Sequence, residues 1–208
     1  MIQHLKPHAT FFRQETRLSA SNKNTILISP LCELNPLLAG HICREVTRVF
    51  GYPTEICPLL SDVEFVMDQD RLQYHSTPIL ERLAQAAPPN ALKVLAIVAV
   101  DLFIPILTHV YGEAQLGGRA CVVSTFRLGE GLLRASHPED FRLRLVKEAV
   151  HELGHTFSLH HCKDPSCIMH YCRSVKDVDK KSMELCRYCR ILLNDEIKRN
   201  SGIEELRN

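Results

Sequence analysis

The stretch HELGHTFSLHHC, residues 151–162, contains four histidines, and three of them, His151, His155 and His161, have the spacing of a metal site. On an α-helix, positions four apart lie on one face, so His151 and His155 can direct their imidazoles to one point. Two imidazoles at this spacing suit a tetrahedral Zn²⁺, and Glu152 lies one position further round the helix, beside the water that the metal would hold. A third ligand must come from beyond the helix end, and we expect His161 to supply it.

The composition bounds the class of protein and its partners. The chain has 208 residues, 45% of them hydrophobic and 24% charged, which is ordinary for a globular protein of one domain or two small subdomains. A net charge of +1 without a long basic block favours neither nucleic acid nor an anionic membrane as a partner. Residues 1–25 lack the apolar core of a signal peptide, and the longest apolar run, Ala91–Leu107, is too short and too interrupted to span a bilayer. We therefore expect a cytoplasmic protein, monomeric by default.

Strands and helices alternate in the first 126 residues. The pattern predicts strands over 25–29, 54–59, 92–103 and 120–126, and helices over 35–50 and 78–87. Residues 62–75 fit neither pattern, and residues 111–119 are interpreted as a glycine-bearing bend. The run 92–103 is rich in valine and leucine and is predicted to be a strand covered on both faces. This alternation indicates an α/β layer architecture.

The histidine motif belongs to a longer predicted helix. Pro138 is favoured at a first helical position, and Glu139 and Asp140 follow in the first turn. Apolar residues then recur at helical spacing as far as Phe157. After this point the chain is rich in cysteine and polar residues, and a helical pattern resumes over 179–199. We therefore expect an N-terminal subdomain over 1–158, with its helix at about 138–158, and a small C-terminal subdomain over 159–208.

Five of the nine cysteines are crowded into residues 162–189. In a chain without a secretion signal, clustered cysteines more often bind metal than form disulfides. Cys162 and Cys167, followed by Cys186 and Cys189, have the pairing of a structural tetrathiolate zinc, which would stabilise a subdomain with few apolar residues. Disulfides and packed free thiols are the alternatives. Cys172 could replace Cys167 as a ligand, but we expect it to be a free thiol.

The residues of the motif suit amide hydrolysis. Zinc held by three neutral imidazoles keeps its charge and one open position, so the pKa of its bound water falls from 15.7 toward ~7. Glu152 would accept the proton as the hydroxide attacks a carbonyl carbon, and then pass it to the leaving amine. Three alternatives stay open: His160 as the third ligand, Glu184 as the third ligand, or a non-catalytic protein with two structural zincs whose cleft binds peptide.

The order of these residues resembles a known signature. The run His151-Glu152-x₂-His155-x₅-His161-Cys162-x₄-Cys167-x-Met169, with Cys186-x₂-Cys189 downstream, resembles the archaemetzincins, zinc peptidases of the metzincin clan. The resemblance implies the clan fold, which combines a twisted mixed sheet and packed helices with a small C-terminal subdomain. It also implies two zinc ions per chain: a catalytic zinc on the three histidines, with Glu152 as general base, and a structural zinc on the four cysteines.

The resemblance implies further roles. Met169 would form the Met-turn, an apolar floor beneath the histidines, and Tyr171 would approach the zinc and help to stabilise the oxyanion. The strand Ala120–Phe126 would be the edge strand along which an extended peptide or protein substrate lies. Ser158 stands where the clan motif has glycine, at the left-handed turn that redirects the chain to the third histidine. A non-glycine residue costs roughly 1–2 kcal/mol in that conformation.

Overall fold

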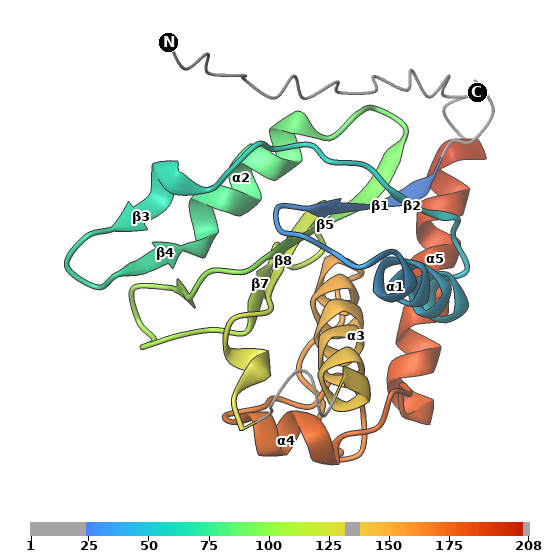
Figure 1. Ribbon diagram of the computed structural model, residues 1–208. Coiled ribbons are helices and arrows are strands. Elements are labelled where there is room, and N and C mark those ends of the chain that lie inside the picture. The colour runs from blue at the N-terminus through green and yellow to red at the C-terminus, as the bar shows by residue number, and fades with distance from the viewer. Residues whose placement is uncertain (1–23, 132–137, 206–208) are drawn as a thin grey trace, which may run out of the picture.

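A mixed five-stranded sheet organises the computed structural model, which describes residues 24–131 and 138–205 (Figure 1). Its strands are β1 (Thr25–Pro30), β2 (Thr54–Ile56), β5 (Ala91–Val98), β7 (Gly112–Ala114) and β8 (Ala120–Ser124). They lie in the order β2-β1-β5-β8-β7. The pairs β1–β2, β1–β5 and β5–β8 are parallel, whereas β7 is antiparallel to β8. The predicted α/β architecture with a mixed sheet is confirmed.

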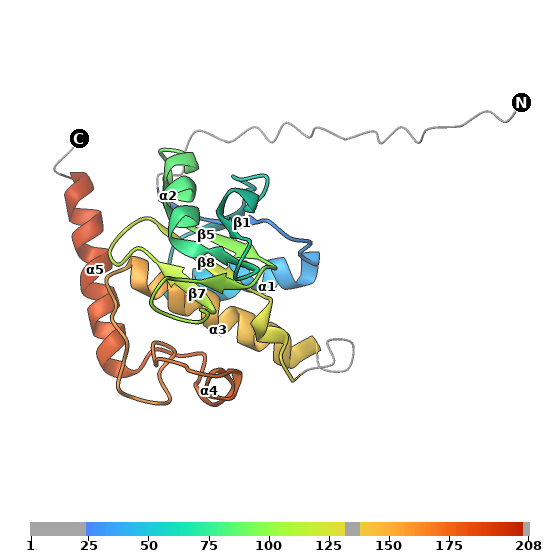
Figure 2. The same ribbon diagram turned by 90° about the vertical axis from the view of Figure 1, so that its left-hand side faces the viewer.

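Helices cover both faces of this sheet. The helices are α1 (Pro36–Phe50), α2 (Ser76–Ala86), α3 (Pro138–Thr156), α4 (Val175–Lys180) and α5 (Arg187–Glu205). Figures 1 and 2 show α2 on one face and α1 and α3 on the other. Along β5, Leu95 and Ile97 join the core that contains α1 and α3, whereas Val94 and Ala96 join the core that contains α2. This strand is therefore covered on both faces, as its apolar run predicts.

Local signals fix the ends of α1. The side chain of Asn35 accepts a hydrogen bond from the backbone N–H of Leu37 at 2.8 Å, which caps the first turn. Gly51 ends the helix with a φ of 79°, and its N–H bonds to the carbonyl of Thr47. The helix lies where the sequence pattern predicts it.

The prediction of one strand over 92–103 is wrong. β5 ends at Val98, and Leu102–Phe103 forms a separate strand, β6, in a small sheet with β3 (Met67–Asp68) and β4 (Gln73–His75). The break lies at Asp101, whose carboxylate binds the side chains of Arg127 and Gln73. A charged side chain with such partners cannot continue a strand that is apolar on both faces. The unassigned residues 62–75 supply β3, β4 and one short 3₁₀ turn, η1 (Glu64–Val66).

The prediction that residues 120–126 form the edge strand is also wrong. β8 lies between β5 and β7, and all its side chains are buried. The edge strand next to β8 is β7, which lies inside the segment interpreted as a bend. This strand has only three residues, Gly112, Glu113 and Ala114, so no alternating apolar pattern marks it.

The predicted helical segment 179–199 is two helices rather than one. α4 ends at Lys180 and α5 begins at Arg187. Between them the backbone bonds back to the cysteine-rich loop, because Ser182 N–H donates to Ser166 O and Ile168 N–H donates to Glu184 O. Across the described ranges, 24–131 and 138–205, no helix has both the length and the apolar character that a membrane span needs.

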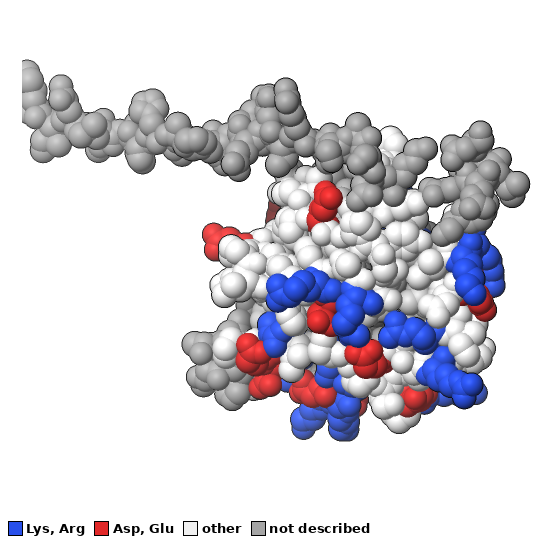
Figure 3. Space-filling model, turned by 90° about the vertical axis from the view of Figure 1, so that its right-hand side faces the viewer, with Lys and Arg blue, Asp and Glu red and all other residues white. Residues whose placement is uncertain are grey.

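Charges of both signs are interspersed on the face of the molecule near α1 and α5 (Figure 3). Glu184 forms ion pairs with Arg48 of α1 at 2.9 Å and with Arg190 of α5 at 3.4 Å. These side chains are partly exposed, so each pair contributes at most about 1 kcal/mol. They nevertheless join α1 to the C-terminal segment.

Candidate active site

Three histidine rings meet at the C-terminal half of α3. The ring centroids of His151 and His155, one turn apart on the helix, are 4.7 Å apart. The ring of His161 lies 5.3 Å from the first and 4.8 Å from the second. The possible ligand atoms of the three residues all lie within 4.8 Å of one another. The structure therefore brings together the three residues that the sequence predicts as ligands.

Backbone carbonyls orient two of the rings. Nδ1 of His151 lies 2.9 Å from Ile168 O, and Nδ1 of His155 lies 2.6 Å from Leu159 O. A carbonyl only accepts, so each Nδ1 carries the proton and each Nε2 presents a lone pair to the cluster. These two Nε2 atoms lie 3.1 Å apart, although neither can donate to the other. Two nitrogens bound to one tetrahedral zinc at 2.0–2.1 Å are separated by about 3.3 Å, so the site fits zinc.

Burial keeps these imidazoles neutral. It lowers the pKa of His155 to about 4 and holds the pKa of His151 well below its usual value, where the nearby Lys181 adds to the effect. Burial also lowers the pKa of His161. Because a metal binds the neutral imidazole, the three rings are ready to act as ligands at neutral pH.

The chain turns sharply at Ser158, whose φ is +62°. The N–H of Leu159 donates to Gly154 O at 3.1 Å and the N–H of Ser158 donates to His155 O at 3.0 Å. This is the bonding pattern of a Schellman helix end, with serine in the left-handed position that glycine usually takes. The turn carries the chain back to the metal cluster. It brings His161 to the other two rings and leaves His160 exposed outside the cluster.

The strands of the sheet hold this helix end in place. The N–H of Gly117, in the turn between β7 and β8, donates to His155 O at 2.9 Å. The ammonium of Lys93, on β5, donates to Thr156 O at 2.6 Å and to Gly118 O at 2.7 Å. A cation is favourable beside the last carbonyls of a helix. Sequence reasoning assigned no role to Lys93, although a single charge inside an apolar run was a signal.

Glu152 is buried beside the histidines and faces the edge strand. Its pKa is raised well above the usual value, first by burial and then by the nearby carboxylate of Glu148. Gly112 of β7 makes room for it, because a Cβ at Gly112 would lie 2.8 Å from Oε1 and 2.7 Å from Cγ of Glu152. The need for glycine at position 112 could not be seen in the sequence.

A cleft of about 350 Å³ runs past this site, between β7 and the segment Tyr171–Arg173. Tyr171 is 44% exposed, and its ring lies 5.0 Å from that of His161. Met169 is fully buried, and a Cβ at Gly154 would lie 2.5 Å from its Sδ. The methionine therefore packs against α3 at Gly154, which lies between the first two histidines of the motif.

A second cluster contains four thiols. Sγ atoms of Cys162, Cys167, Cys186 and Cys189 lie within 4.8 Å of one another. The Sγ atoms of Cys162 and Cys186 are 3.8 Å apart, too far for a disulfide and close to the spacing of about 3.8 Å between two thiolates on a tetrahedral zinc. Backbone N–H groups support the cluster, because Cys186 donates to Cys167 Sγ at 3.3 Å. The donor set fits a tetrathiolate zinc.

The two remaining ligand candidates lie elsewhere. Cys172 is a free thiol that lines the cleft and donates to His170 O at 3.6 Å. Burial raises its pKa to about 11. The carboxylate of Glu184 pairs with Arg48 and Arg190, as described above, and is not among the groups that could hold a metal within residues 24–131 and 138–205.

A buried ion pair beneath the cleft was missed by sequence reasoning. Nζ of Lys181 lies 2.7 Å from Oε1 of Glu148, and their side chains are 0% and 4% exposed. Lys147, which precedes Glu148 on α3, donates to the carbonyls of Val178 and Asp179, and Arg144, one turn earlier, forms two hydrogen bonds with the Asp179 carboxylate. These contacts fasten α3 to the end of α4.

Comparison with known proteins gives consistent matches. The model of a family described as Peptidase family M54 matches residues 66–195. The archaemetzincin of Archaeoglobus fulgidus is 37% identical over 165 residues, which cover 79% of this chain and 95% of the relative. The archaemetzincin of Methanocaldococcus jannaschii is 32% identical over 171 residues, with 82% and 93% covered.

The chain also aligns with solved structures of archaemetzincins. The crystal structure of archaemetzincin from Methanopyrus kandleri aligns with a TM-score of 0.72 and 31% identity, over 86% of this chain and 98% of the other. The crystal structure of archaemetzincin from A. fulgidus, complexed with malonate, aligns with a TM-score of 0.68 and 34% identity, over 81% and 99%.

Proposed function

The chain belongs to peptidase family M54 and is a zinc metallopeptidase, and we propose that it hydrolyses peptide bonds with Glu152 as the general base. The observation that carries this proposal is the geometry of His151, His155 and His161, whose nitrogens converge beside the buried Glu152 carboxylate. The archaemetzincin resemblance is confirmed, and the proposal adds the residue roles to it.

We assign the catalytic zinc to these three histidines and a second, structural zinc to the four clustered cysteines, Cys162, Cys167, Cys186 and Cys189. The buried Met169, packed against Gly154 below the rings, supports placing the chain in the metzincin clan. Disulfides are rare in the cytosol, where thiols stay reduced and free to bind metal, and on this ground we propose a cytoplasmic location. A monomeric state stays a prediction.

A zinc ion held by the histidines would lower the pKa of a bound water toward ~7 and polarise the substrate carbonyl. The side chains provide the rest. Glu152 accepts the proton of the attacking water and passes it to the leaving amine, because its carboxylate lies beside the cluster at the edge of the cleft. We assign to Tyr171 the donation of a hydrogen bond to the oxyanion, a role supported by its ring lying 5.0 Å from that of His161.

We propose that the substrate lies along the outer edge of β7. This strand pairs with β8 on one side and lines the cleft on the other through Gly112, Glu113 and Ala114. An extended peptide can add to such an edge through backbone hydrogen bonds, which demand little of its sequence. A peptide or protein is therefore the proposed partner.

The non-catalytic alternative depended on Ser158 preventing the turn to the third histidine. Ser158 adopts the left-handed conformation, and its backbone bonds complete the helix end. His161 therefore lies with His151 and His155 despite the serine, and this alternative loses its support.

The test is peptide hydrolysis by zinc-loaded protein and its Glu152→Gln variant, with zinc counted in both. We expect the variant to keep its zinc and lose 10²–10⁴-fold in kcat, the usual contribution of a general base. Full activity in E152Q would remove this role. In zinc analysis, H161A and C189S should each bind one zinc fewer than the wild type, and an unchanged count would remove that residue from its ligand set.

A further inference from the structure

One wall of the cleft is the segment between β6 and β7, residues 104–111. It contributes the apolar side chains of Ile104, Leu107 and Val110 to the cleft lining. Ile106, in the same segment, is 85% exposed and is not part of the lining. The wall therefore presents three apolar side chains to the cleft beside those of Thr108, His109 and Tyr111, and Ile106 is an apolar residue of the same segment outside the lining.

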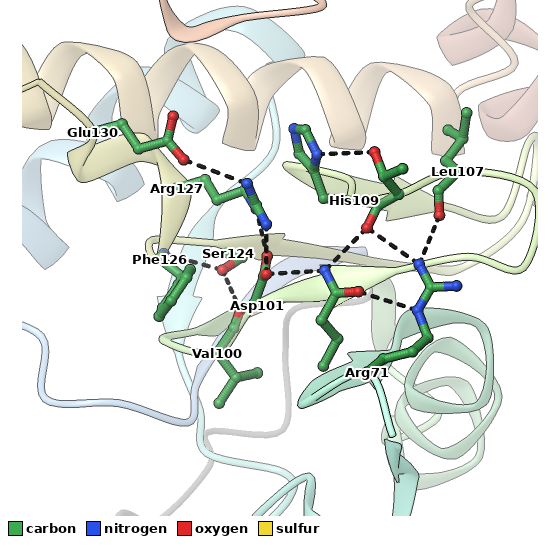
Figure 4. A network of polar contacts seen from close by, with 11 residues as sticks. Arg71, Val100, Asp101, Leu107, His109, Ser124, Phe126, Arg127 and Glu130 are labelled. Atoms are coloured by element: carbon green, nitrogen blue, oxygen red, sulfur yellow. Dashed lines mark hydrogen bonds and ion pairs between the residues drawn. The ribbon is translucent and has the colours of Figure 1, made fainter. Parts of the chain in front are cut away.

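Two side chains from the β3–β4 hairpin hold the backbone of this wall (Figure 4). The guanidinium of Arg71 donates to Leu107 O at 3.1 Å and to Thr108 O at 3.2 Å. The amide of Gln73 also donates to Thr108 O, at 3.0 Å. Neither Arg71 nor Gln73 lines the cleft. The hydrogen bonds to the carbonyls of Leu107 and Thr108 therefore come from side chains outside the cleft lining.

The hydrogen bonds that begin at Arg71 and Gln73 continue as far as η2 (Arg127–Gly129), the 3₁₀ turn after β8. Gln73 also donates to the carboxylate of Asp101 at 2.9 Å, and Arg127, in η2, binds the same carboxylate at 2.6 and 2.7 Å. The Arg71 guanidinium lies 4.1 Å from the ring centroid of Phe103. A wall held at Leu107 and Thr108 by three side-chain hydrogen bonds, two of them from a guanidinium, is preorganised, so little ordering is needed when a ligand packs on it.

The cleft lining also contains charged side chains, among them Arg173 and, on β7, Glu113, which accepts hydrogen bonds from Ser76 and Thr77. Tyr171 and Cys172 line the same cleft, and the carboxylate of Glu148 is already paired with Lys181. A charged substrate side chain placed against Ile104 and Leu107 would lose water without gaining a hydrogen bond from these two side chains, which is unfavourable.

We propose that this wall selects substrates by one apolar side chain, such as leucine, and that Arg71 is a positioning residue for the wall. The inference rests on the proposed peptide hydrolysis for its setting, but it concerns binding. Contact with an apolar wall discriminates by about tenfold to a hundredfold between side chains of different size.

The test is a leucine scan. A set of alanine-rich peptides, each with one leucine at a different position, is titrated against zinc-loaded E152Q protein by fluorescence anisotropy. We expect one position at which leucine binds at least tenfold more tightly than alanine, and aspartate less tightly than alanine. Adding L107S should reduce that leucine preference to less than threefold, whereas I106S, its matched control outside the lining, should retain it.

The role of Arg71 is tested by R71M against R82M. Both arginines lie over a phenylalanine ring, at 4.1 Å for Arg71 and 4.3 Å for Arg82, but only Arg71 has bonds to the wall. R71M should lower the leucine preference, and R82M should not. A merely structural effect of R71M would weaken leucine and alanine peptides equally and leave the ratio unchanged, which would overturn the positioning role.

The outcomes separate this inference from the proposed function. No leucine preference at any position, no peptide binding at all, or a preference that survives L107S overturns the inference. If the preference is present but wild-type protein cleaves none of the peptides, the hydrolysis proposal fails and the apolar wall stands.

Discussion

Gly112 and Glu152 are packed so closely that a Cβ at Gly112 would lie 2.8 Å from the carboxylate Oε1. The same Cβ would lie 2.5 Å from the carbonyl oxygen of Val122 on β8, so neither strand nor carboxylate could stay in place. The edge strand and the proposed general base are therefore positioned by one contact that requires glycine.

We predict that Gly112→Ala lowers kcat/KM by about 10²-fold, because displacement of a catalytic group by about 1 Å has that effect. Zinc content should not change, since Glu152 is not a proposed ligand. The measurement is peptide hydrolysis with metal analysis of the same samples. Gly40→Ala is the control, because its new Cβ would meet only Arg44 Nη1, at 3.5 Å. Activity of G112A equal to that of G40A would show that the contact does not position Glu152.

Ser158 gives a second prediction. Glycine at 158 would relieve about 1–2 kcal/mol of left-handed strain but would add about 0.4–1 kcal/mol of chain entropy to the unfolded state. Ser158→Gly should therefore leave stability unchanged or raise it by about 1 kcal/mol, with the zinc content of the protein unchanged. Ser158→Val should destabilise the protein and weaken zinc binding at His161, because a β-branched residue resists this conformation. Urea unfolding and zinc titration check both, and a stabilised S158V would refute the strain argument.

The sequence predicted what depends on local spacing. The histidines at 151, 155 and 161 and the paired cysteines lie within 39 residues, and helix geometry alone indicates which groups can meet. The ends of α1 were marked by Asn35 and Gly51 in the same local way.

Contacts between distant segments could not be predicted in this way. Gly112 and Glu152 meet across 40 positions, and Lys93 bonds to Thr156 across 63. The strand β7 has three residues, too few to show a period, so its place at the sheet edge appears only once β8 has paired with β5. The break of the apolar run at Asp101 depends on a partner, Arg127, that lies 26 positions further along the chain, after β8.

The buried pair of Lys181 and Glu148 gives a third prediction. Burial acts to lower the pKa of Lys181, but the Glu148 carboxylate, with smaller contributions from Cys172 and Glu152, outweighs it and the pKa is raised. Lys181→Met would leave a buried carboxylate without its partner, which costs about 3–5 kcal/mol. Urea unfolding should show this loss and its partial recovery in the double variant K181M/E148L. Lys180→Met is the control, because Lys180 is 77% exposed and should change stability by less than about 0.5 kcal/mol. Equal stability of the two single variants would contradict the prediction.

Lys93 gives a prediction about pH. Its pKa is lowered from 10.5 to about 8, chiefly by burial, even though its ammonium donates to two carbonyls. Between pH 8 and 10.5 the unfolded chain keeps this proton while the folded protein releases it, so the free energy of unfolding rises with pH in that window. The stability that deprotonation of Lys93 adds is complete above pH 10.5 and is lost as the pH falls through 8. A shift from 10.5 to about 8 corresponds to about 3 kcal/mol at most.

The measurement is the difference in unfolding free energy between wild type and Lys93→Met, at pH 7.5 and at pH 10. Other titrating groups cancel in this difference, and the same comparison with Lys198→Met removes the effect of losing one surface charge. Between pH 7.5 and pH 10, the unfolding free energy of the wild type should rise by about 2–3 kcal/mol relative to that of K93M. A difference that does not vary with pH would mean that Lys93 is solvated well enough to hold its charge, and that its two carbonyl bonds at the end of α3 are those of an ordinary ammonium.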